Sequence, residues 1–536
     1  MVATGDWISP RVNRVPYFDK PPLLYWLMAL GFSTAGPSPF AARFWSALAA
    51  VGAAVVTARV GTLLGGPRLG LLAGLMTAAN LGMFLFGRIV KPDLVFILCL
   101  ILAFAGFVWA YRGAGRWALV LFYAALGLAT MAKDVLGALG PLAVVALFLA
   151  LTRERPLARW FPWWGVLVAA GIALPWYLAV EAGHRGFLWY TIVDNHLLNF
   201  TRQRVFPDED VPLGALEFLA VTIMACLPWA LAVPWGVARA LRRPAQTVID
   251  RLWLLFALWG LAVVGFFTLS PFKLPHYALP AFPALALLAA RAWDESIEAA
   301  PGAPRPRVLL VPVLVLFAVV GGAFAAARLG VLPLPPDVLA SVDLPTRNLA
   351  ARGQAMTSGP AGPYEPVLLN AAIVFGLATV AMAVAVWRRA PALGVGVALG
   401  AMLAFLPIAG EGMTHFARSR SVRPLVEALA GRAGPGDLIV HEGALENSGS
   451  LLLALRRPVQ VVDGLRSNLA FGSTFPEARD VFWDGPRLRA AWAEPGRKFL
   501  ISAVPPDRSV ARSLPPERLR LLAQGGGRWL YANVAD

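Results

Sequence analysis

Long apolar runs recur along most of this chain, and they constrain its fold more than any other feature. Each is near the roughly 20 residues that cross a bilayer as a helix. Charged residues make up only 15% of the sequence, whereas soluble domains carry about 25%. The sequence therefore predicts an all-α polytopic membrane protein with about twelve spans, at 41–64, 69–87, 92–111, 117–132, 136–152, 163–180, 213–237, 252–270, 277–292, 308–328, 367–387 and 392–410.

Arginine residues occupy alternate connections between these spans, and this bias predicts the orientation of the chain. The basic connections lie near 59–68, 112–116, 153–159, 239–251, 291–307 and 388–389. Because basic loops stay cytoplasmic, the other loops and the tail after 410 are expected to face the periplasm or exterior of a bacterial cytoplasmic membrane. The N-terminus then also lies outside, so we expect Met1 to be an internal residue of a longer protein with one more helix.

The tail after residue 410 is polar and arginine-rich, which predicts a change of domain. We expect a transmembrane domain over 1–410 and a small α/β domain over 411–536. Short strands are predicted at 437–441, 458–462, 498–504 and 528–534, and helices near 421–433, 486–493 and 515–523.

Net charge and cysteine content narrow the function classes. The formal net charge is +16, but the arginines are spread over short loops and the tail, so no nucleic-acid partner is predicted. The two cysteines, Cys99 and Cys226, lie inside apolar runs. Neither a disulfide framework nor a cysteine metal site is expected.

Two outward segments carry a lysine beside prolines at the entrance of a helix. In YFDKPPLLYW, Asp19 and Lys20 precede a short segment, 22–33, that is expected to lie in the membrane interface. In SPFKLPHYALP, Lys273 and Tyr277 stand in a similar setting. A lysine ammonium suits a lipid phosphate. A lysine that reaches to the membrane surface, or a polar loop with an interfacial tyrosine, would explain the same residues without a ligand.

Further ionisable residues lie at other predicted helix ends. Arg88 and Asp93 lie at the mouth of one span and Lys133 at another, where ionisable groups are functional candidates. Asp93 is a candidate for orienting a sugar hydroxyl or for acid–base catalysis; an Arg–Asp pair that fixes the loop is the alternative. Arg202 and His196 lie in an outward loop, and an isolated histidine is more often structural than a ligand.

These motifs resemble those of the bacterial phospholipid-carrier-dependent glycosyltransferases, which include the lipid A aminoarabinose transferases and, more distantly, the protein O-mannosyltransferases. The resemblance rests on GDWISPRVNRVPYFDKPPLLYW, AKDVLGALGPLA, DNHLLNF and SPFKLPHYALP, which occur in the family order along nearly the whole chain. It implies a type C glycosyltransferase fold with a periplasmic α/β domain. It also implies an inverting transfer from a polyprenyl-phosphate sugar, without a nucleotide cofactor.

The resemblance also assigns roles to individual residues. Lys20, Lys133, Lys273 and Tyr277 correspond to residues that bind the carrier phosphate, and Arg88 and Arg202 are further candidates for this role. Asp93 resembles a second functional carboxylate. Asp19 and His196 resemble an acidic/histidine pair that holds zinc, although the family usually has Glu at the first position. A further catalytic Asp is expected upstream of Met1, and if the short chain is genuine, weak or no transferase activity is predicted.

Two alternatives remain open at this stage. A transporter or flippase for a lipid-linked sugar would need polar groups near the bilayer midplane, whereas the polar groups here lie near the ends of the predicted spans. A catalytically inactive member that only binds carrier lipid is the other alternative. The acceptor, whether lipid, glycan or protein, is not specified by the sequence.

Overall fold

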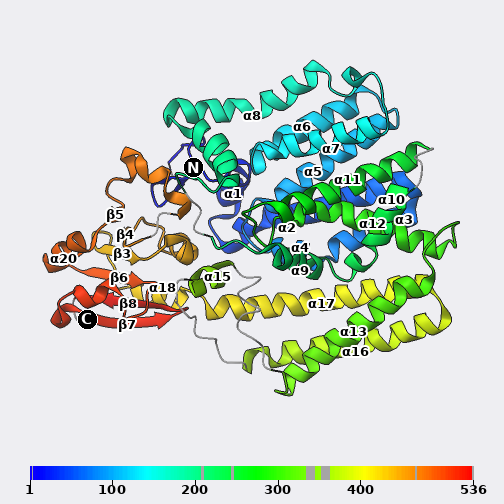
Figure 1. Cartoon of the computed structure of the whole chain (residues 1–536). Helices are drawn as coiled ribbons and strands as arrows, with labels where there is room; N and C mark the ends of the chain where they lie inside the picture. The colour runs from blue at the N-terminus through cyan, green and yellow to red at the C-terminus, as the bar shows by residue number, and fades with distance from the viewer. Residues whose placement is uncertain are drawn as a thin grey trace.

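The structure is a computed structural model that describes residues 1–2, 4–206, 210–242, 247–332, 344–351, 362–464 and 467–533. Helices form a large bundle, and a small domain with a β-sheet lies at one end of it (Figure 1). The N-terminal segment lies between the two, beside α1. The loop 329–366 and the basic connection 239–251 are therefore described only in part, and the last predicted strand loses residue 534.

Helices account for most of the first 420 residues. Their bounds are α1 (Leu23–Ala35), α2 (Pro39–Gly65), α3 (Pro67–Ala78), α4 (Leu81–Phe86), α5 (Asp93–Tyr111), α6 (Arg116–Ala132), α7 (Leu136–Leu151), α8 (Trp163–Gly183), the π-helix η2 (Trp189–Leu198), α9 (Ala215–Cys226), α10 (Val233–Arg242), α11 (Val248–Leu269), α12 (Phe282–Ile297), α13 (Pro306–Arg328), α15 (Leu344–Ala351), α16 (Glu365–Arg388) and α17 (Pro391–Ser419).

Seven of the helices in the described residues are long and apolar enough to cross a membrane, or eight if one bent pair is counted as a span. The bent pair falls in the segment 213–237, where α9 and the helix beginning at Trp229 meet at 111°. The segment 69–87 is interrupted at Asn80, whose side chain accepts a hydrogen bond from Met83 N and so begins a new helix. The expected all-α membrane fold is confirmed, whereas the count of twelve spans stays a prediction.

α5 is the central helix of the bundle, since 78% of its apolar segment is buried inside the protein. Small residues allow its neighbours to approach closely. A Cβ added at Gly106 of α5 would lie 2.7 Å from Phe122 N of α6, and one added at Gly70 of α3 would lie 2.1 Å from Thr62 Oγ1 of α2. Such close helix pairs hold fixed the helix ends that carry the polar residues.

The C-terminal domain is the predicted α/β domain. Its six-stranded sheet has the order β5-β4-β3-β6-β8-β7. β3 pairs in parallel with β4 and β6, and β8 pairs antiparallel with β6 and β7. The bounds are β3 (Leu438–Glu442), β4 (Gln460–Val462), β5 (Phe482–Trp483), β6 (Lys498–Ser502), β7 (Arg520–Gly525) and β8 (Arg528–Ala532), with helices α18 (Arg423–Leu429), α19 (Gly449–Leu455) and α20 (Gly485–Ala493).

The predicted strands β3, β4, β6 and β8 are confirmed, but the helix expected near 515–523 is wrong. That segment is a short 3-10 turn, Pro516–Arg518, followed by β7. Its apolar residues belong to a strand because β8, which follows directly, offers an antiparallel partner.

The domain boundary predicted at 410/411 falls inside a helix, because α17 continues past residue 410 to Ser419. The position of the boundary stays a prediction.

Candidate active site

The loop between β2 (Val15–Pro16) and α1 carries the first lysine of the candidate site. Lys20 Nζ lies 2.8 Å from Oδ2 of Asp19 and also donates to its backbone oxygen at 3.1 Å. The Tyr17 hydroxyl donates to the same carboxylate at 3.4 Å. Pro21 precedes α1 and Pro22 caps it, so the rigid proline backbone holds this charged pair at the start of the helix.

Several groups near Lys20 keep its ammonium charged. Burial acts to lower the pKa of Lys20, but the Asp19 carboxylate, and after it Tyr277 and Asp134, outweigh burial and raise that pKa. About a third of the lysine side chain remains exposed, 31%, against 14% for Asp19. Lys20 is therefore a charged group that a ligand can reach.

A second lysine and carboxylate meet where α5 begins and α6 ends. Lys133, the residue that follows α6, donates from Nζ to Oδ1 of Asp93 at 2.7 Å. Only 2% of the Asp93 side chain and 12% of the Lys133 side chain are exposed. The Lys133 ammonium also lies 5.3 Å from the centre of the Tyr277 ring, within cation–π range.

Tyr277 connects the two lysines. Its ring faces Lys133, and its hydroxyl is close enough to Lys20 to affect that lysine electrostatically. The neighbouring aromatic ring of Phe267 lies 4.9 Å away and that of His276 lies 5.0 Å away. Four predicted residues, Lys20, Asp93, Lys133 and Tyr277, are thus brought into one region from four separate parts of the chain.

Lys273 lies in the same loop as Tyr277, but its ammonium group binds a backbone carbonyl oxygen. Its Nζ donates to the carbonyl oxygen of Thr268 at 2.9 Å, near the end of α11, and its side chain is buried. Its own carbonyl oxygen accepts a hydrogen bond from Leu213 N. No contact between Lys273 and the other predicted phosphate ligands is recorded within the described ranges, so its phosphate role stays a prediction.

The two predicted arginines are placed differently. The Arg88 guanidinium stacks 3.4 Å from the centre of the Phe84 ring. Arg202 is exposed and has a left-handed backbone, with φ of 59°. Neither has a recorded contact with the lysines in the part of the chain that the structure describes, and their roles stay predictions.

Asp19 and His196, the residues expected to hold zinc, have other neighbours. Asp19 pairs with Lys20, while Nε2 of His196 lies 3.9 Å from Oδ1 of Asp134. Over the described ranges, no three His, Cys, Asp or Glu side chains gather around a common point as a zinc site requires. Asp19 and His196 therefore do not form a metal site together among the described residues, and zinc binding stays a prediction.

Other ionisable residues join the site: Lys91, which the sequence places at the mouth of the same span as Asp93, and His276 and Asp210, which were not singled out from the sequence. Lys91 and His276 both act electrostatically on Asp93. Burial is the main cause that lowers the pKa of Lys91, and burial followed by the charge of Lys91 lowers that of His276. The available signal in the sequence was their position beside residues with predicted roles, since Lys91 lies two residues before Asp93 and His276 directly precedes Tyr277. Asp210 is close enough to Lys91 and Lys20 to interact with both electrostatically, and burial raises its pKa.

Asp194 is a structural residue of η2, the helix that also carries His196. It is fully buried, and its carboxylate accepts hydrogen bonds from the backbone of Val205 at 2.6 Å and from Arg204 Nε at 3.3 Å. These bonds hold Arg204 and Val205, which follow η2 in the chain, against that helix.

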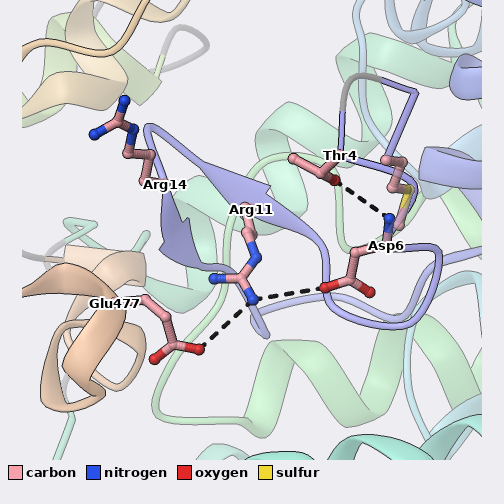
Figure 2. A pocket seen from close by; sticks show the side chains of 6 residues that line it. Thr4, Asp6, Arg11, Arg14 and Glu477 are labelled. Carbon is pink, nitrogen blue, oxygen red and sulfur yellow. Dashed lines mark hydrogen bonds and ion pairs between the residues drawn. The ribbon is translucent and has the colours of Figure 1, made fainter.

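A separate pocket of about 570 Å³ opens where the N-terminal segment meets the C-terminal domain (Figure 2). Glu477 comes from the C-terminal domain and the other lining residues from the chain start, Met1, Thr4, Asp6, Arg11 and Arg14. Its lining contains two arginines and two carboxylates but none of the residues of the lysine cluster, Lys20, Lys133 and Tyr277.

The lysine cluster can bind an anion and orient a polar ligand. Ammonium groups and a phenol hydroxyl suit phosphate oxygens, while a buried carboxylate fixed by a lysine suits a hydroxyl group. The charged groups lie at helix ends of an apolar bundle, where a lipid with a charged head would present that head.

Comparison with known proteins places the chain in a family. Residues 19–178 match the family described as dolichyl-phosphate-mannose-protein mannosyltransferase. An undecaprenyl phosphate-alpha-4-amino-4-deoxy-L-arabinose arabinosyl transferase of Pseudomonas paraeruginosa is 30% identical over 71% of this chain and 69% of its own length. The corresponding enzyme of Edwardsiella ictaluri is 31% identical over 54% of this chain and 52% of its own length.

A solved structure shares the fold over the whole chain. ArnT from Cupriavidus metallidurans, solved bound to undecaprenyl phosphate, aligns with a TM-score of 0.79 over 100% of this chain and 92% of its own, at 24% identity.

The helical bundle, its sheet domain and the polar cluster at the helix ends define an integral inner-membrane glycosyltransferase of the type C fold. More specifically, the chain belongs to the family of the undecaprenyl phosphate-aminoarabinose arabinosyl transferases.

Proposed function

We propose that the chain transfers a sugar from a polyprenyl-phosphate carrier to an acceptor at the outer face of the cytoplasmic membrane. The observation that carries this proposal is the convergence of Lys20, Lys133 and Tyr277 beside the buried carboxylate of Asp93. The relatives are named as undecaprenyl phosphate-aminoarabinose arabinosyl transferases, which makes undecaprenyl phosphate the carrier of first choice. Membership of this family favours an enzyme over a transporter.

The basic residues would act on the leaving group. In the transfer, the bond between the anomeric carbon and the carrier phosphate breaks, and the acceptor oxygen forms a new bond to that carbon. Charge then accumulates on the phosphate, where Lys20 and the Tyr277 hydroxyl can stabilise it. Preorganised charges of this kind stabilise a transition state without reorganising as the reaction proceeds.

Asp93 would position the sugar. Its carboxylate is already fixed by Lys133 at 2.7 Å and is nearly inaccessible to bulk water. A hydroxyl or amino group of the donor sugar could bind its second oxygen. Such fixed contacts reduce the entropy cost of aligning the reacting atoms. We propose 4-amino-4-deoxy-L-arabinose as the first sugar to test and an outer-leaflet glycolipid such as lipid A as the first acceptor.

The site is proposed to face the periplasm. Support comes from the basic connection near 112–116, which joins the end of α5 opposite Asp93 to the end of α6 opposite Lys133. Basic loops remain on the cytoplasmic side, so the lysine cluster would lie on the outer side, together with the C-terminal domain.

Transfer of labelled sugar from a synthetic undecaprenyl-phosphate donor tests the proposal, using the full chain purified in detergent. Lys20→Ala is expected to reduce the transfer rate by about 100-fold or more, as for removal of one transition-state donor. Arg423→Ala is the matched control, because that arginine side chain is 81% exposed on the C-terminal domain. Equal rates in Lys20→Ala and the control would refute the role of Lys20.

Lys273→Ala is the second variant, and it separates two roles. If Lys273 binds the carrier phosphate, the transfer rate falls strongly with little change in thermal unfolding. If it only caps α11 through Thr268, the unfolding temperature falls instead.

Detergent removes the two compartments that a transporter needs, so transfer of sugar in detergent excludes a flippase. Binding of undecaprenyl phosphate without any transfer would identify an inactive member of the family.

A further inference from the structure

A short hairpin near the N-terminus is fastened to the C-terminal domain. β1 (Arg11–Val12) and β2 (Val15–Pro16) are joined by Asn13 and Arg14, whose φ values of 54° and 70° fit a tight hairpin turn. The Asn13 side chain donates to Val459 O at 2.7 Å and accepts from Val459 N at 2.8 Å. The Asn13 side-chain amide thus makes the same two hydrogen bonds to Val459 that the backbone of a neighbouring strand would make.

The hairpin also packs tightly against the C-terminal domain. Val15 is fully buried and belongs to the same apolar core as Ile439 of β3. A Cβ added at Gly472 of the domain would lie 1.8 Å from the carbonyl oxygen of Pro16. No side chain fits there unless the hairpin moves, so glycine at 472 permits the close contact.

An aromatic cluster continues this contact towards the candidate active site. Phe18 is 3% exposed. Its ring lies 6.2 Å from each of Phe471 and Phe475 of the C-terminal domain, and 4.8 Å from His184, which follows α8. Phe471 also stacks on Tyr190 of η2, with 4.3 Å between ring centres and 4° between planes. The C-terminal domain therefore contacts two segments of the transmembrane domain at once.

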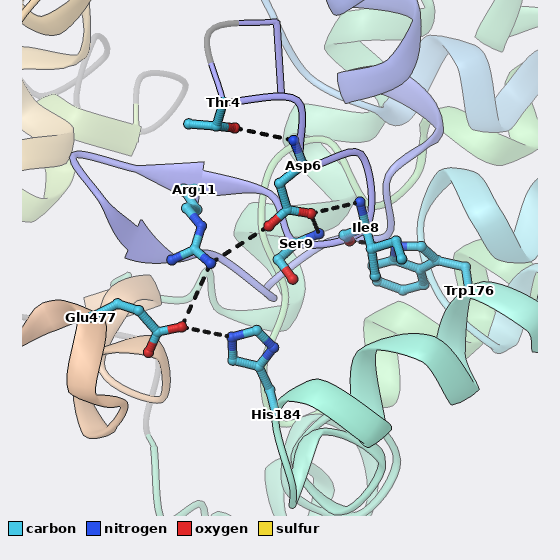
Figure 3. A network of polar contacts seen from close by, with 8 residues as sticks. All are labelled: Thr4, Asp6, Ile8, Ser9, Arg11, Trp176, His184 and Glu477. Atoms are coloured by element: carbon cyan, nitrogen blue, oxygen red, sulfur yellow. Dashed lines mark hydrogen bonds and ion pairs between the residues drawn. The ribbon is translucent and has the colours of Figure 1, made fainter.

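Charged groups close the edge of the contact (Figure 3). Oε1 of Glu477 lies 3.5 Å from Arg11 and 3.3 Å from His184 Nε2. Burial would raise the pKa of Glu477, but hydrogen bonds from the backbone and His184, and the charge of Arg11, lower it. The carboxylate is thus charged at neutral pH and joins the hairpin to the end of α8.

We propose that segment 471–477 of the C-terminal domain is a positioning element for the carrier-phosphate site. Phe18, which this segment contacts, lies two residues before Lys20. Tyr190, on which Phe471 stacks, is close enough to Asp19 and Lys20 to interact with both electrostatically. The segment thus restrains the Asp19–Lys20 pair through Phe18 and through Tyr190, although it contributes no ligand itself. This inference rests on the proposed function.

The physical reason is the geometry that an anion site requires. The Asp19–Lys20 pair lies in a short loop and is partly exposed, so local hydrogen bonds alone restrain it weakly. Contacts on Phe18 and Tyr190 remove that freedom before the ligand arrives. A displacement of about 1 Å at a reacting group can cost about 100-fold in rate.

Gly472→Ala tests this directly in the full-length, detergent-purified protein. The added methyl group collides with the hairpin at Pro16 and Val15, whereas Gly436→Ala, in the same domain, adds a methyl group with no neighbour within 4 Å. We expect Gly472→Ala to weaken binding of undecaprenyl phosphate by about tenfold and Gly436→Ala to leave it unchanged. Binding is measured as a dissociation constant by microscale thermophoresis.

A double-mutant cycle with Lys20→Ala distinguishes positioning from a general loss of structure. If the segment acts through Lys20, Gly472→Ala causes no further loss of affinity once Lys20 is alanine. Fully additive losses, or equal affinities of Gly472→Ala and Gly436→Ala, would overturn the inference. Failure of the wild-type protein to bind undecaprenyl phosphate would instead count against the proposed function.

Phe471→Leu keeps the test decisive if Gly472→Ala does not fold. It removes the stacking on Tyr190 and the contact with Phe18. Its control is Phe499→Leu, which changes another buried phenylalanine, one in β6 that belongs to the core of the domain. Weaker binding in Phe471→Leu alone supports the inference, and the same affinity in both variants contradicts it.

Discussion

Lysines and carboxylates of the candidate site form pairs of unequal burial. Lys133 and Asp93 are almost enclosed, whereas Lys20 beside Asp19 keeps about a third of its side chain exposed. A buried pair depends on both partners because a single charge left inside is costly. In a partly exposed pair, the lysine can exchange its carboxylate partner for a ligand at a lower cost. The first pair therefore suits a fixed framework that holds the Asp93 carboxylate in place for the donor sugar, and the second suits binding of an incoming phosphate.

Lys133→Met tests this division at the scale of single residues. Removing one partner of a buried pair typically costs about 3–5 kcal/mol, so we expect the unfolding temperature of the purified protein to fall by several degrees. Adding Asp93→Asn removes the unpaired charge and is expected to restore much of the loss. Lys20→Ala should cause a smaller change. If Lys133→Met and Lys20→Ala destabilise the protein equally, the distinction between framework and ligand site is wrong.

Helices of this bundle owe their packing to glycine at a few crossing points. α2 and α3 form a close pair in which the Cα of Gly70 faces the backbone of α2; a Cβ there would lie 2.6 Å from Ala58 O. Gly171 of α8, by contrast, has no neighbour within 4 Å of an added Cβ. The same substitution should therefore have opposite effects in two helices.

Gly70→Ala is expected to force α2 and α3 apart and to lower the unfolding temperature of the purified protein. Gly171→Ala should leave it unchanged or raise it slightly, since alanine favours a helix by about 1 kcal/mol over glycine. Fluorescence-detected size-exclusion chromatography after heating measures both. Equal stability of the two variants would show that the α2–α3 crossing tolerates a wider separation.

At the scale of the whole molecule, the orientation in the membrane decides which pool of substrates the site can reach. Arg423 on the C-terminal domain and Arg388 at the end of α16 are both exposed. The proposed topology puts the first outside and the second inside the cell. The natural cysteines, Cys99 and Cys226, are buried, so introduced cysteines can be labelled against a low background.

We expect an impermeant maleimide to label Arg423→Cys in intact spheroplasts and to label Arg388→Cys only after the membrane is permeabilised. The reverse pattern would place the C-terminal domain in the cytoplasm and would contradict the proposed periplasmic site. The unsubstituted protein, treated in the same way, controls for labelling of the natural cysteines.

Local patterns in the sequence were enough for several features of this protein. Apolar runs predicted a helical membrane domain because a helix satisfies its own backbone hydrogen bonds in lipid. The change of composition after 410 predicted the sheet domain and four of its strands. The motif residues Lys20, Lys133, Asp93 and Tyr277 were named correctly as neighbours of helix ends, since charged residues rarely occur deeper in an apolar bundle.

Only the tertiary structure decided how these features combine. The break at Asn80 and the bend between α9 and the following helix come from capping and packing that hydropathy does not record. The pairing of Lys133 with Asp93 joins helices α6 and α5, and the fastening of Asn13 to Val459 joins residues 446 positions apart. The lysines could be recognised from the sequence; their partners, and the role of the C-terminal domain beside Phe18, depend on contacts between distant segments.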